Sequence, residues 1–370
     1  MSACTSRTVS ERSYTIAVDA MGGDHGSAVC VPAAVDVLSH ERDMKIVLVG
    51  QLDQIQQYLP KSHAFGDRLS IQAASQVVAM NERPQEALRK KKDSSMRIAI
   101  ETVKSGVADA CVSAGNTGAL MATARFVLKT IDGIDRPAIL SRIPSARGYT
   151  HMLDLGANAE CTAEHLLQFA MMGSVVAQDV FGLSQPRVGI LNIGEEDIKG
   201  NGVVQEAGKL LAAAGSLNYI GFVEGDDIFS GDVDVVVTDG FTGNVALKTM
   251  EGLAHMLAAR IKAEFTRNAV RKLGALAAFP ALRSLRAGLD TRAHNGASMV
   301  GLKGIVVKSH GSADALAFAN AIRVAGSEAR SGVPQKIAQI LATLHRPEPS
   351  QTLNAAEDPI DGPSAASGIQ

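Results

Sequence analysis

Short apolar segments rich in valine and isoleucine alternate along this chain with longer segments of helical spacing. The segments 14–19, 186–194 and 303–311 are apolar at successive positions, which is typical of strands buried on both faces of a parallel sheet. Between such segments, stretches such as 202–215 and 313–330 repeat apolar residues with the period of an amphipathic helix. The alternation predicts an α/β fold, a doubly wound and mostly parallel sheet flanked by helices.

The length and composition suit one large folded unit with short tails. The chain has 370 residues, of which 46% are hydrophobic, so it can bury a sizeable core. We expect a single α/β catalytic domain over residues 13–345. Residues 1–12 and 346–370 are expected to be disordered tails, because the second segment holds four of the twelve prolines and few large apolar residues.

The cysteines and the overall charge exclude several classes. Cys4, Cys30, Cys111 and Cys161 are scattered, form no CxxC pair and have no histidine cluster beside them. A reduced, cytoplasmic compartment is therefore the simpler interpretation, with no metal or cofactor. The N-terminus has no signal-peptide pattern, no apolar run is long enough for a membrane helix, and a net charge of -2 argues against nucleic-acid binding.

Six predicted strands are followed directly by glycines and small polar residues. Ligands bind at the carboxyl ends of the strands in an open parallel sheet. We therefore expect several of these six loops to converge on one pocket. The loops cover residues 19–26, 113–119, 154–161, 192–202, 238–248 and 308–315.

The second of these loops, at residues 113–119, has the composition of an anion site. Glycines let backbone amides approach a ligand closely, and the N-terminus of the following helix favours negative charge. The predicted phosphate-binding residues are Ser113, Gly115, Asn116, Thr117 and Gly118. The same residue types often only form the turn and cap the helix, and this alternative stays open for any single loop.

Common nucleotide and hydrolase motifs are absent. There is no GxGxxG, GxxxxGK[ST], GxSxG or HExxH pattern, which disfavours dinucleotide-binding, P-loop, serine-hydrolase and zincin classes. Cys111 lies within a predicted strand without a nearby histidine, so it is a poor candidate nucleophile. His25 and His310 each follow a strand, and either residue could be structural or catalytic.

Several long blocks resemble the phosphate acyltransferases of bacterial phospholipid synthesis, the PlsX family. The blocks include IAVDAMGGDHG, RKKKDSSM, DACVSAGNTGALMA, LDLGANAEC, VGILNIGEEDIKGN, VVTDGFTGNVALKTMEG and IVVKSHGSADALAFANAI, and the resemblance covers about residues 14–345. It implies reversible transfer of a fatty acyl group from acyl carrier protein to inorganic phosphate, giving acyl phosphate. It also implies a fold similar to the isocitrate/isopropylmalate dehydrogenases, a homodimer, peripheral membrane association and a membrane glycerol-3-phosphate acyltransferase as the next enzyme.

The reaction needs positioning and charge stabilisation more than covalent catalysis, because phosphate is already nucleophilic. We expect Lys199, oriented by residues 195–197, to be the counter-charge of the phosphate. Asn244 is the candidate oxyanion donor, and His310 is the candidate proton donor to the departing sulfur. The other predicted substrate-binding residues are Asp19, Gly22, Gly23, His25, Asn158, Asn201, Asp239, Gly243, Lys248, Gly311 and Ser312.

A basic segment near residues 253–293 predicts a helical hairpin that protrudes from the domain. Residues 255–293 hold eight Arg or Lys and two acids, a local charge of +6, and Pro280 should break the helix near an apolar tip. The hairpin could pack on the core or on a second subunit, rest on anionic lipid, or dock acidic acyl carrier protein. The predicted contact residues are Arg271, Lys272, Leu276, Phe279, Leu282, Arg283 and Arg286.

Two other functions remain open on the sequence alone. A phosphotransacetylase-like enzyme would use acyl-CoA in place of the carrier-protein thioester, and the loops do not distinguish the two donors. A membrane-recruited binding protein with an inactive site is the alternative from another class. Six polar strand ends are more than such a scaffold needs.

Overall fold

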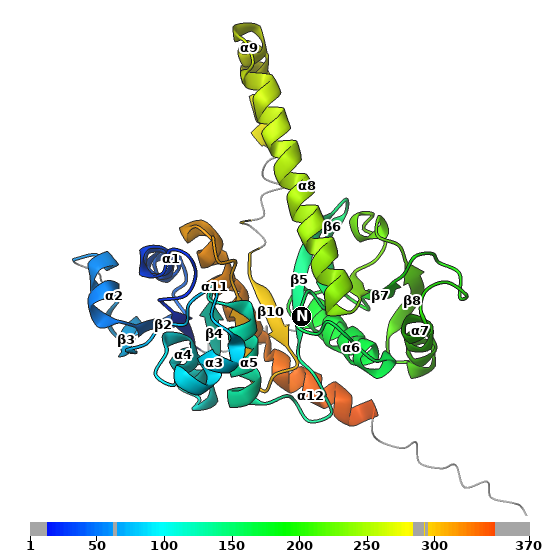
Figure 1. Ribbon diagram of the computed structural model, residues 1–370, viewed down its shortest axis with the longest axis horizontal. Coiled ribbons are helices and arrows are strands. Elements are labelled where there is room, and N and C mark those ends of the chain that lie inside the picture. The colour runs from blue at the N-terminus through cyan, green and yellow to red at the C-terminus, as the bar shows by residue number, and fades with distance from the viewer. Residues whose placement is uncertain (1–12, 62–64, 284–291, 293–294, 345–370) are drawn as a thin grey trace, which may run out of the picture.

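The computed structural model describes residues 13–61, 65–283, 292 and 295–344 (Figure 1). One sheet of eleven strands runs through these residues. In spatial order its strands are β3 (Leu69–Ala73), β2 (Met44–Gly50), β1 (Tyr14–Asp19), β4 (Ala110–Ser113), β11 (Ile305–Lys308), β10 (Ala297–Val300), β5 (Ala138–Ser145), β6 (Gly148–Leu153), β9 (Val235–Val237), β7 (Arg187–Leu191) and β8 (Asn218–Val223).

The helices between these strands follow the predicted alternation. They are α1 (Ser27–His40), α2 (Leu52–Tyr58), α3 (Pro84–Lys90), α4 (Ser95–Lys104), α5 (Thr117–Leu128), α6 (Ala163–Asp179), α7 (Gly202–Ala214), α8 (Gly240–Thr266), α9 (Ala269–Ala277), α11 (Ala315–Ser331) and α12 (Val333–Leu344), with short 3-10 turns at Gly66–Arg68 and Asp227–Phe229. The predicted helices at 202–215 and 313–330 correspond to α7 and α11.

The sheet is mostly parallel but reverses direction in its middle. Seven of its ten strand pairings are parallel. The antiparallel pairings are β11 with β10, β10 with β5, and β5 with β6. Because three reversals separate β11 from β6, the strands from β6 to β8 run opposite to those from β3 to β11. The predicted α/β class is confirmed, whereas the central reversal was not predicted.

Helices cover both faces of the sheet, as a doubly wound fold requires. In β1, Ile16 and Val18 pack with apolar residues of α1 and α11, whereas Ala17 points to the face covered by α4 and α5. Around β6 and β9, a further cluster is built on α6 and includes the fully buried Phe169. These packed layers fix the ends of the strands, from which the functional loops emerge.

Three strands had escaped the sequence analysis, each for a physical reason. The edge strand β3 is largely exposed and has no continuous apolar run. β5 contains Arg142 and Pro144, and a proline inside an apolar run argues against a strand. β10 has only four residues and follows a segment that reads as a turn. β10 and β5 are the strands that reverse the sheet, so missing them hid the reversal.

Helix α8 projects from the body of the molecule, and α9 lies at its far end (Figure 1). Asp239 starts α8 by accepting a hydrogen bond from the amide of Thr242 at 2.8 Å. Of the 27 residues of α8, only Gly240 and Gly243 are buried. The predicted protruding segment is therefore present, although it begins much earlier than residue 253.

The projecting segment bends twice within the described residues. Asn268 caps α9 by accepting a hydrogen bond from the amide of Arg271 at 2.9 Å. α9 ends at Ala277, and residues 279–283 are helical again, so the second break precedes Pro280. Residues 284–291, which include the predicted contact residue Arg286, lie outside the described residues, so the returning half of a hairpin stays a prediction.

Two further predictions concern parts of the chain or properties that the structure does not describe. The predicted tails at 1–12 and 346–370 lie outside the described residues. The assignment of residues 13–345 to one domain stays a prediction. Among the described helices, none combines the length and hydropathy required to cross a bilayer.

A buried carboxyl group joins α11 to β10. Glu328 is 3% exposed and accepts a hydrogen bond from the hydroxyl of Ser298. Burial raises the pKa of Glu328 to about 7, although the hydrogen bond from Ser298 acts in the opposite direction. The protonated acid is therefore the form that the folded protein favours, and ionisation near neutral pH costs stability.

We predict that Glu328→Gln removes this pH dependence. The unfolded Glu328 ionises near pH 4.5, so the stability that its protonated form contributes is present below that pH and is lost as the pH rises to about 7. The full loss is up to about 3 kcal/mol, and most of it falls between pH 5 and pH 8. Urea unfolding at pH 5 and at pH 8 should show that the free energy of unfolding falls by about 2 kcal/mol more in the wild type than in Glu328→Gln. Equal losses would contradict the prediction.

Candidate active site

Three of the six predicted loops meet at one edge of the sheet, after β1, β4 and β11. The hydroxyl of Ser113 donates to the carboxylate of Asp19 at 2.6 Å and accepts from the amide of Gly115 at 3.0 Å. The amide of Asp24 donates to the carbonyl of Gly311 at 2.9 Å. These bonds tie the β1 loop to both neighbouring loops, so this part of the predicted convergence is confirmed.

Asp19 is the buried centre of this junction. Its side chain is 1% exposed, and burial raises the pKa of its carboxyl group above the ordinary value. Hydrogen bonds from Ser113, from Ser95 and from the backbone at Met21 and Gly22 oppose that shift. Asp19 thus organises the loops from within, and direct contact with a substrate stays a prediction. Ser95, which the sequence analysis missed, belongs to the RKKKDSSM block.

The loops approach so closely that glycines are required between them. A Cβ atom on Gly22 would lie 2.7 Å from Oδ2 of Asp19 and 2.8 Å from the amide nitrogen of Gly115. Gly23 has a φ of +85°, and its Cβ position lies 2.8 Å from the carbonyl oxygen of Gly311. The predicted glycines therefore allow backbone to approach backbone, which positions the amides around them.

A buried lysine lies among these loops. Lys308, the last residue of β11, is 9% exposed and donates hydrogen bonds to the carbonyl of Ala114, at 3.3 Å, and to that of Ser309. Burial lowers the pKa of Lys308 to about 8, while Asp19 and Asp24 oppose the shift. Lys308 was not among the predicted site residues, although a lysine that closes an otherwise apolar strand is an available signal.

The predicted phosphate loop starts α5. Asn116 caps the helix by accepting from the amide of Ala119 at 3.0 Å, and its amide group donates to the carbonyls of Met80 and Glu82. The side chain of Asn116 therefore has a structural role, in agreement with the alternative that these residue types only form the turn and cap the helix. Thr117 and Gly118 are exposed, and their amides have no hydrogen-bond partner among the described residues. Phosphate binding at these amides stays a prediction.

His310 lies at the exposed rim of the β11 loop. Its Nδ1 is 2.9 Å from the hydroxyl of Ser312, and its amide donates to the side chain of Asn295. Burial lowers the pKa of His310, and Glu251 and Lys248 of α8 act on it in opposite directions. Asp314 caps α11 by accepting a hydrogen bond from the amide of Ala317 at 2.9 Å.

A second group of loops surrounds Asp154, at the end of β6. The carboxylate accepts hydrogen bonds from the amides of Ile139, Gly156, Ala157 and Asn158 and from the side chain of Asn158. Burial raises the pKa of the Asp154 carboxyl group, and these hydrogen bonds oppose the shift. Asn158 also donates to the carbonyl of Pro137, so this predicted substrate residue has a structural role.

Helix α8 begins directly against the Asp154 loop. The amide of Gly240 donates to the carbonyl of Asn158 at 2.7 Å, and a Cβ atom on Gly243 would lie 2.0 Å from the carbonyl oxygen of Asp154. Asp239 is used as the helix cap. Asn244, the candidate oxyanion donor, is exposed on the first turns of α8, with its Cβ 3.4 Å from the Cβ position of Gly156.

The six loops do not all leave the same edge of the sheet, because the sheet reverses, and convergence of the second three with the first three on one pocket stays a prediction. The loops after β6, β9 and β7 leave the edge opposite to that of the β1, β4 and β11 loops. The central strands are short, however: β10 and β11 have four residues each, about 13 Å. Residues 240–248 of α8 rise by about 12 Å. The first turns of α8 nevertheless lie near enough to the β11 loop for Lys248 to act on Lys308 and His310.

Lys199 lies in a different region from the predicted phosphate loop. β7 is six strand positions from β4, roughly 29 Å at about 4.8 Å per strand. Lys199 is exposed, and its side chain forms no ion pair with Glu195, Glu196 or Asp197 in the described part of the chain. The expectation that this acidic triplet orients Lys199 is therefore wrong. Asn201, in the same loop, caps α7 by accepting from the amide of Val204.

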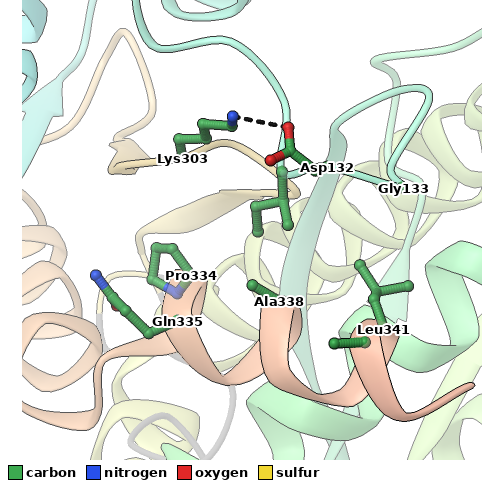
Figure 2. A pocket seen from close by; sticks show the side chains of 9 residues that line it. Asp132, Gly133, Lys303, Pro334, Gln335, Ala338 and Leu341 are labelled. Carbon is green, nitrogen blue, oxygen red and sulfur yellow. Dashed lines mark ion pairs between the residues drawn. The ribbon is translucent and has the colours of Figure 1, made fainter. Parts of the chain in front are cut away.

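A pocket of about 670 Å³ lies elsewhere, between the loop 131–133, Lys303 and α12 (Figure 2). Lys303 and Asp132 form an ion pair of 2.7 Å across its rim. Pro334, Ala338 and Leu341 supply an apolar wall. Lys303 precedes β11, so this pocket is at the opposite end of that strand from Lys308, and none of the predicted site residues lines it.

The α/β fold of this chain is shared with solved phosphotransacetylases. A phosphotransacetylase from Streptococcus pyogenes has a TM-score of 0.59 at 18% identity and covers 86% of this chain and 94% of its own. The EutD phosphotransacetylase from Staphylococcus aureus has a TM-score of 0.54 at 17% identity, with 85% and 94% covered. At these identities the likeness concerns the fold alone.

Sequence relatives define the family more narrowly. A phosphate acyltransferase of Alkalilimnicola ehrlichii is 58% identical over 333 residues, covering 90% of this chain and 97% of the relative. A phosphate acyltransferase of Methylococcus capsulatus is 56% identical, covering 88% and 96%. The family described as "Fatty acid synthesis protein" matches residues 14–336. The chain belongs to this family, and the resemblance found in the sequence is confirmed.

We predict that Gly22→Ala disturbs the junction of the three loops. The added methyl group would overlap Asp19 and Gly115, and overpacking of this kind costs about 1–3 kcal/mol. Gly225→Ala is the matched control, because its Cβ position has no atom within 4 Å and its φ is ordinary. Urea unfolding should show a lower free energy of unfolding for Gly22→Ala only. Equal stability of the two variants would mean that the loops are not packed as described.

Proposed function

We propose that this chain is a phosphate acyltransferase that moves a fatty acyl group from acyl carrier protein to inorganic phosphate. The product, an acyl phosphate, would serve phospholipid synthesis, and the reaction would be reversible. Membership of the family and the names of its relatives support the acyltransferase activity. The observation that carries the site assignment is the junction of the β1, β4 and β11 loops around buried Lys308.

Phosphate is chemically suited to the loops at this junction. The exposed amides of Thr117 and Gly118 begin a helix of twelve residues, and a helix N-terminus attracts anions. Lys308 is held at the adjacent loop by its contact with the carbonyl of Ala114. We assign Lys308 as the principal counter-charge and Lys248, on α8, as a second one. Lys199 becomes the weaker candidate.

The proposed chemical step is a direct displacement at the thioester. A phosphate oxygen forms a bond to the carbonyl carbon, the carbon–sulfur bond breaks, and the departing thiolate takes up a proton. A thiol has an ordinary pKa of about 8.5, so an ammonium group with a pKa of about 8 is well matched to supply that proton. Lys308 can therefore neutralise the phosphate and protonate the sulfur.

His310 suits a different part in this step. Its lowered pKa keeps the imidazole neutral at pH 7, so it is a poor acid for protonating sulfur. With Nδ1 directed at Ser312, the other ring nitrogen is available to donate a hydrogen bond to the developing oxyanion. We propose that His310 shares this oxyanion role with Asn244.

We predict that Lys308→Met raises the phosphate KM at least tenfold, whereas Lys199→Ala changes it less than about twofold. Losing a buried hydrogen-bonded charge beside an anion typically costs 2–5 kcal/mol. The assay combines carrier-protein thioester with labelled phosphate and traps acyl phosphate with hydroxylamine. A sharp rise for Lys199→Ala alone would transfer the counter-charge role back to Lys199.

The same assignment can be checked through the pH profile. Lys308 carries its charge below a pH of about 8 and loses it above that value. The phosphate KM of the wild type should therefore rise above pH 8, by up to about tenfold per unit. Lys308→Arg keeps its charge and should show no such rise, whatever its absolute activity. Identical alkaline limbs in both proteins would count against Lys308.

The projecting segment supports two further contacts. Leu253, Met256, Leu257 and Ile261 of α8 form an exposed apolar stripe at helical spacing, which suits a homodimer contact. At the far end, Leu273, Leu276 and Phe279 are 58–71% exposed beside Arg271 and Lys272, a pattern that suits a peripheral contact with anionic lipid. Packing on this chain's own core is excluded for α9, which has no buried residue. Contact with a glycerol-3-phosphate acyltransferase at the membrane would follow.

We predict that Phe279→Asp lowers binding to vesicles that contain anionic lipid by about tenfold, because one buried aromatic side chain contributes roughly 1.5–3 kcal/mol. Co-sedimentation with vesicles at two salt concentrations measures this effect. Phe229→Asp is a control, because that exposed aromatic residue lies near β9, on the body of the molecule. Binding that ignores both salt and Phe279→Asp would contradict the membrane contact.

The alternatives give different results in the same assay. A phosphotransacetylase-like enzyme would turn over acyl-CoA faster than the carrier-protein thioester. A binding protein with an inactive site would turn over neither donor with phosphate present, although it would still bind vesicles.

A further inference from the structure

The surface around α3 is the most basic part of the described body that the proposed chemistry does not use. Residues 83–92 contain Arg83, Arg89 and three consecutive lysines, Lys90 to Lys92, against a single acid, Glu86. Their local charge is +4, so the rest of the chain, whose total is -2, carries -6. Four of these five cations are exposed, and the fifth is partly exposed.

Most of this charge is not neutralised within the chain. Lys90 pairs with Glu86 at 3.4 Å, on one turn of α3. Arg83, Arg89, Lys91 and Lys92 form no ion pair with the described residues. Unpaired cations concentrated on one surface produce a positive potential that attracts acidic partners. We call the five cations the α3 patch.

The α3 patch continues onto α4 and α5 through an exposed aromatic residue. A guanidinium nitrogen of Arg97 donates to the carbonyl of Leu88, and the guanidinium also lies 5.7 Å from the ring centroid of Phe126. Lys129 lies 4.9 Å from the same ring. Phe126 is 51% exposed, so the cations surround an apolar side chain. Binding surfaces often combine such an aromatic anchor with charged neighbours.

The α3 patch is attached to the site at both of its ends. Before it, the side chain of Asn116 holds the carbonyls of Met80 and Glu82 at the start of α5. After it, Ser95 contributes a hydrogen bond to the carboxylate of Asp19. α3 has seven residues, about 10 Å, so the cations lie within a short distance of both attachments.

A small apolar bridge also links the patch to the β11 loop. Met80 is 42% exposed, and its terminal methyl carbon lies 2.8 Å from the Cβ position of Gly311. A partner on the α3 patch could therefore extend a thioester arm past Met80 towards His310 and Lys308.

We propose that the α3 patch, with Phe126 at its edge, docks the acidic carrier protein that delivers the acyl thioester. This inference rests on the proposed function and names the surface that its donor uses. Charge complementarity selects the partner: an acidic protein surface meets five cations, and a small thioester does not need them.

The cations on the projecting segment are less suited to this partner. Thr266, at the end of α8, lies eighteen residues beyond Lys248, roughly 27 Å along the helix at about 1.5 Å per residue, and α9 lies farther out. Glu264 also neutralises Arg271 and lies 3.9 Å from Arg267. A carrier held there would have to bring its thioester back over that length.

The test reverses the three unpaired cations at the end of the patch. In the full chain, Arg89→Glu, Lys91→Glu and Lys92→Glu are combined. The matched control combines Arg42→Glu, Lys61→Glu and Lys209→Glu, which are exposed residues elsewhere on the body. Both triple variants change the net charge from -2 to -8, so an effect of overall charge would appear in both.

Kinetics with two donors separate docking from chemistry. For the α3 variant, kcat/KM with the carrier-protein thioester should fall at least tenfold at low salt, and the salt dependence should weaken. Its kcat/KM with a short acyl-pantetheine thioester should stay within about twofold of the wild type, and the control should resemble the wild type with both donors. Unchanged carrier kinetics, or an equal loss with both donors, would overturn the proposal.

A binding measurement keeps this proposal separate from the proposed function. Fluorescence anisotropy with labelled holo carrier protein, which bears no acyl group, requires no turnover. Binding by the wild type and its loss in the α3 variant would support docking even if phosphate turnover were absent, in which case the proposed function alone would fail. Equal binding by both proteins, or no binding by the wild type, would overturn the docking surface.

Discussion

The hydrogen bond from Ser113 to Asp19 is the interaction on which the proposed site depends. It joins the ends of β1 and β4 beneath the surface, at 2.6 Å, with Asp19 1% exposed and Ser113 fully buried. A carboxyl group without such partners would be costly to bury, and here Ser95 and backbone amides share its oxygens. With this bond in place, Gly22 and Gly23 must pass close to the β4 and β11 loops, and Lys308 is enclosed beside them.

The reversal of the sheet gives the second half of the molecule a different relation to this junction. Because β10 and β5 reverse the strand direction, the Asp154 loop opens at the other edge. Its five hydrogen bonds make it a support for the start of α8 rather than a set of free ligands. α8 then carries Lys248 towards the first junction. One helix thereby replaces the convergence of loops that a uniformly parallel sheet would have given.

Local sequence patterns predicted some of these features and could not predict others. Short apolar runs identified most of the strands, and glycine with small polar residues located the loops, because both signals are local. The direction of β5 was not accessible, since Arg142 and Pro144 obscure its pattern and its partners lie far away in the chain. For the same reason Lys199 was a candidate counter-charge: only the strand order shows how far its loop lies from the predicted phosphate loop. Asn116, Asn201 and Asp239 were predicted to bind ligands, and each of them caps a helix. The sequence does not separate the two roles, because Asn and Asp suit helix ends and ligands equally well.

This geometry explains why positive charge is concentrated in two separate regions of the surface. A thioester carried by a protein must reach Lys308 from a surface next to the loops, and α3 is fastened to those loops through Asn116 and Ser95. The cations on α9 lie beyond the long exposed helix α8, where apolar side chains accompany them. Contact between α9 and lipid is compatible with this distance, because it requires only that the body of the protein stay near the membrane surface. Delivery of a covalently tethered acyl group is not compatible with it, because the tether must reach from the docking surface to Lys308 at every turnover. The two basic regions are therefore suited to different partners, and the short path from α3 to Asp19 favours the carrier protein there.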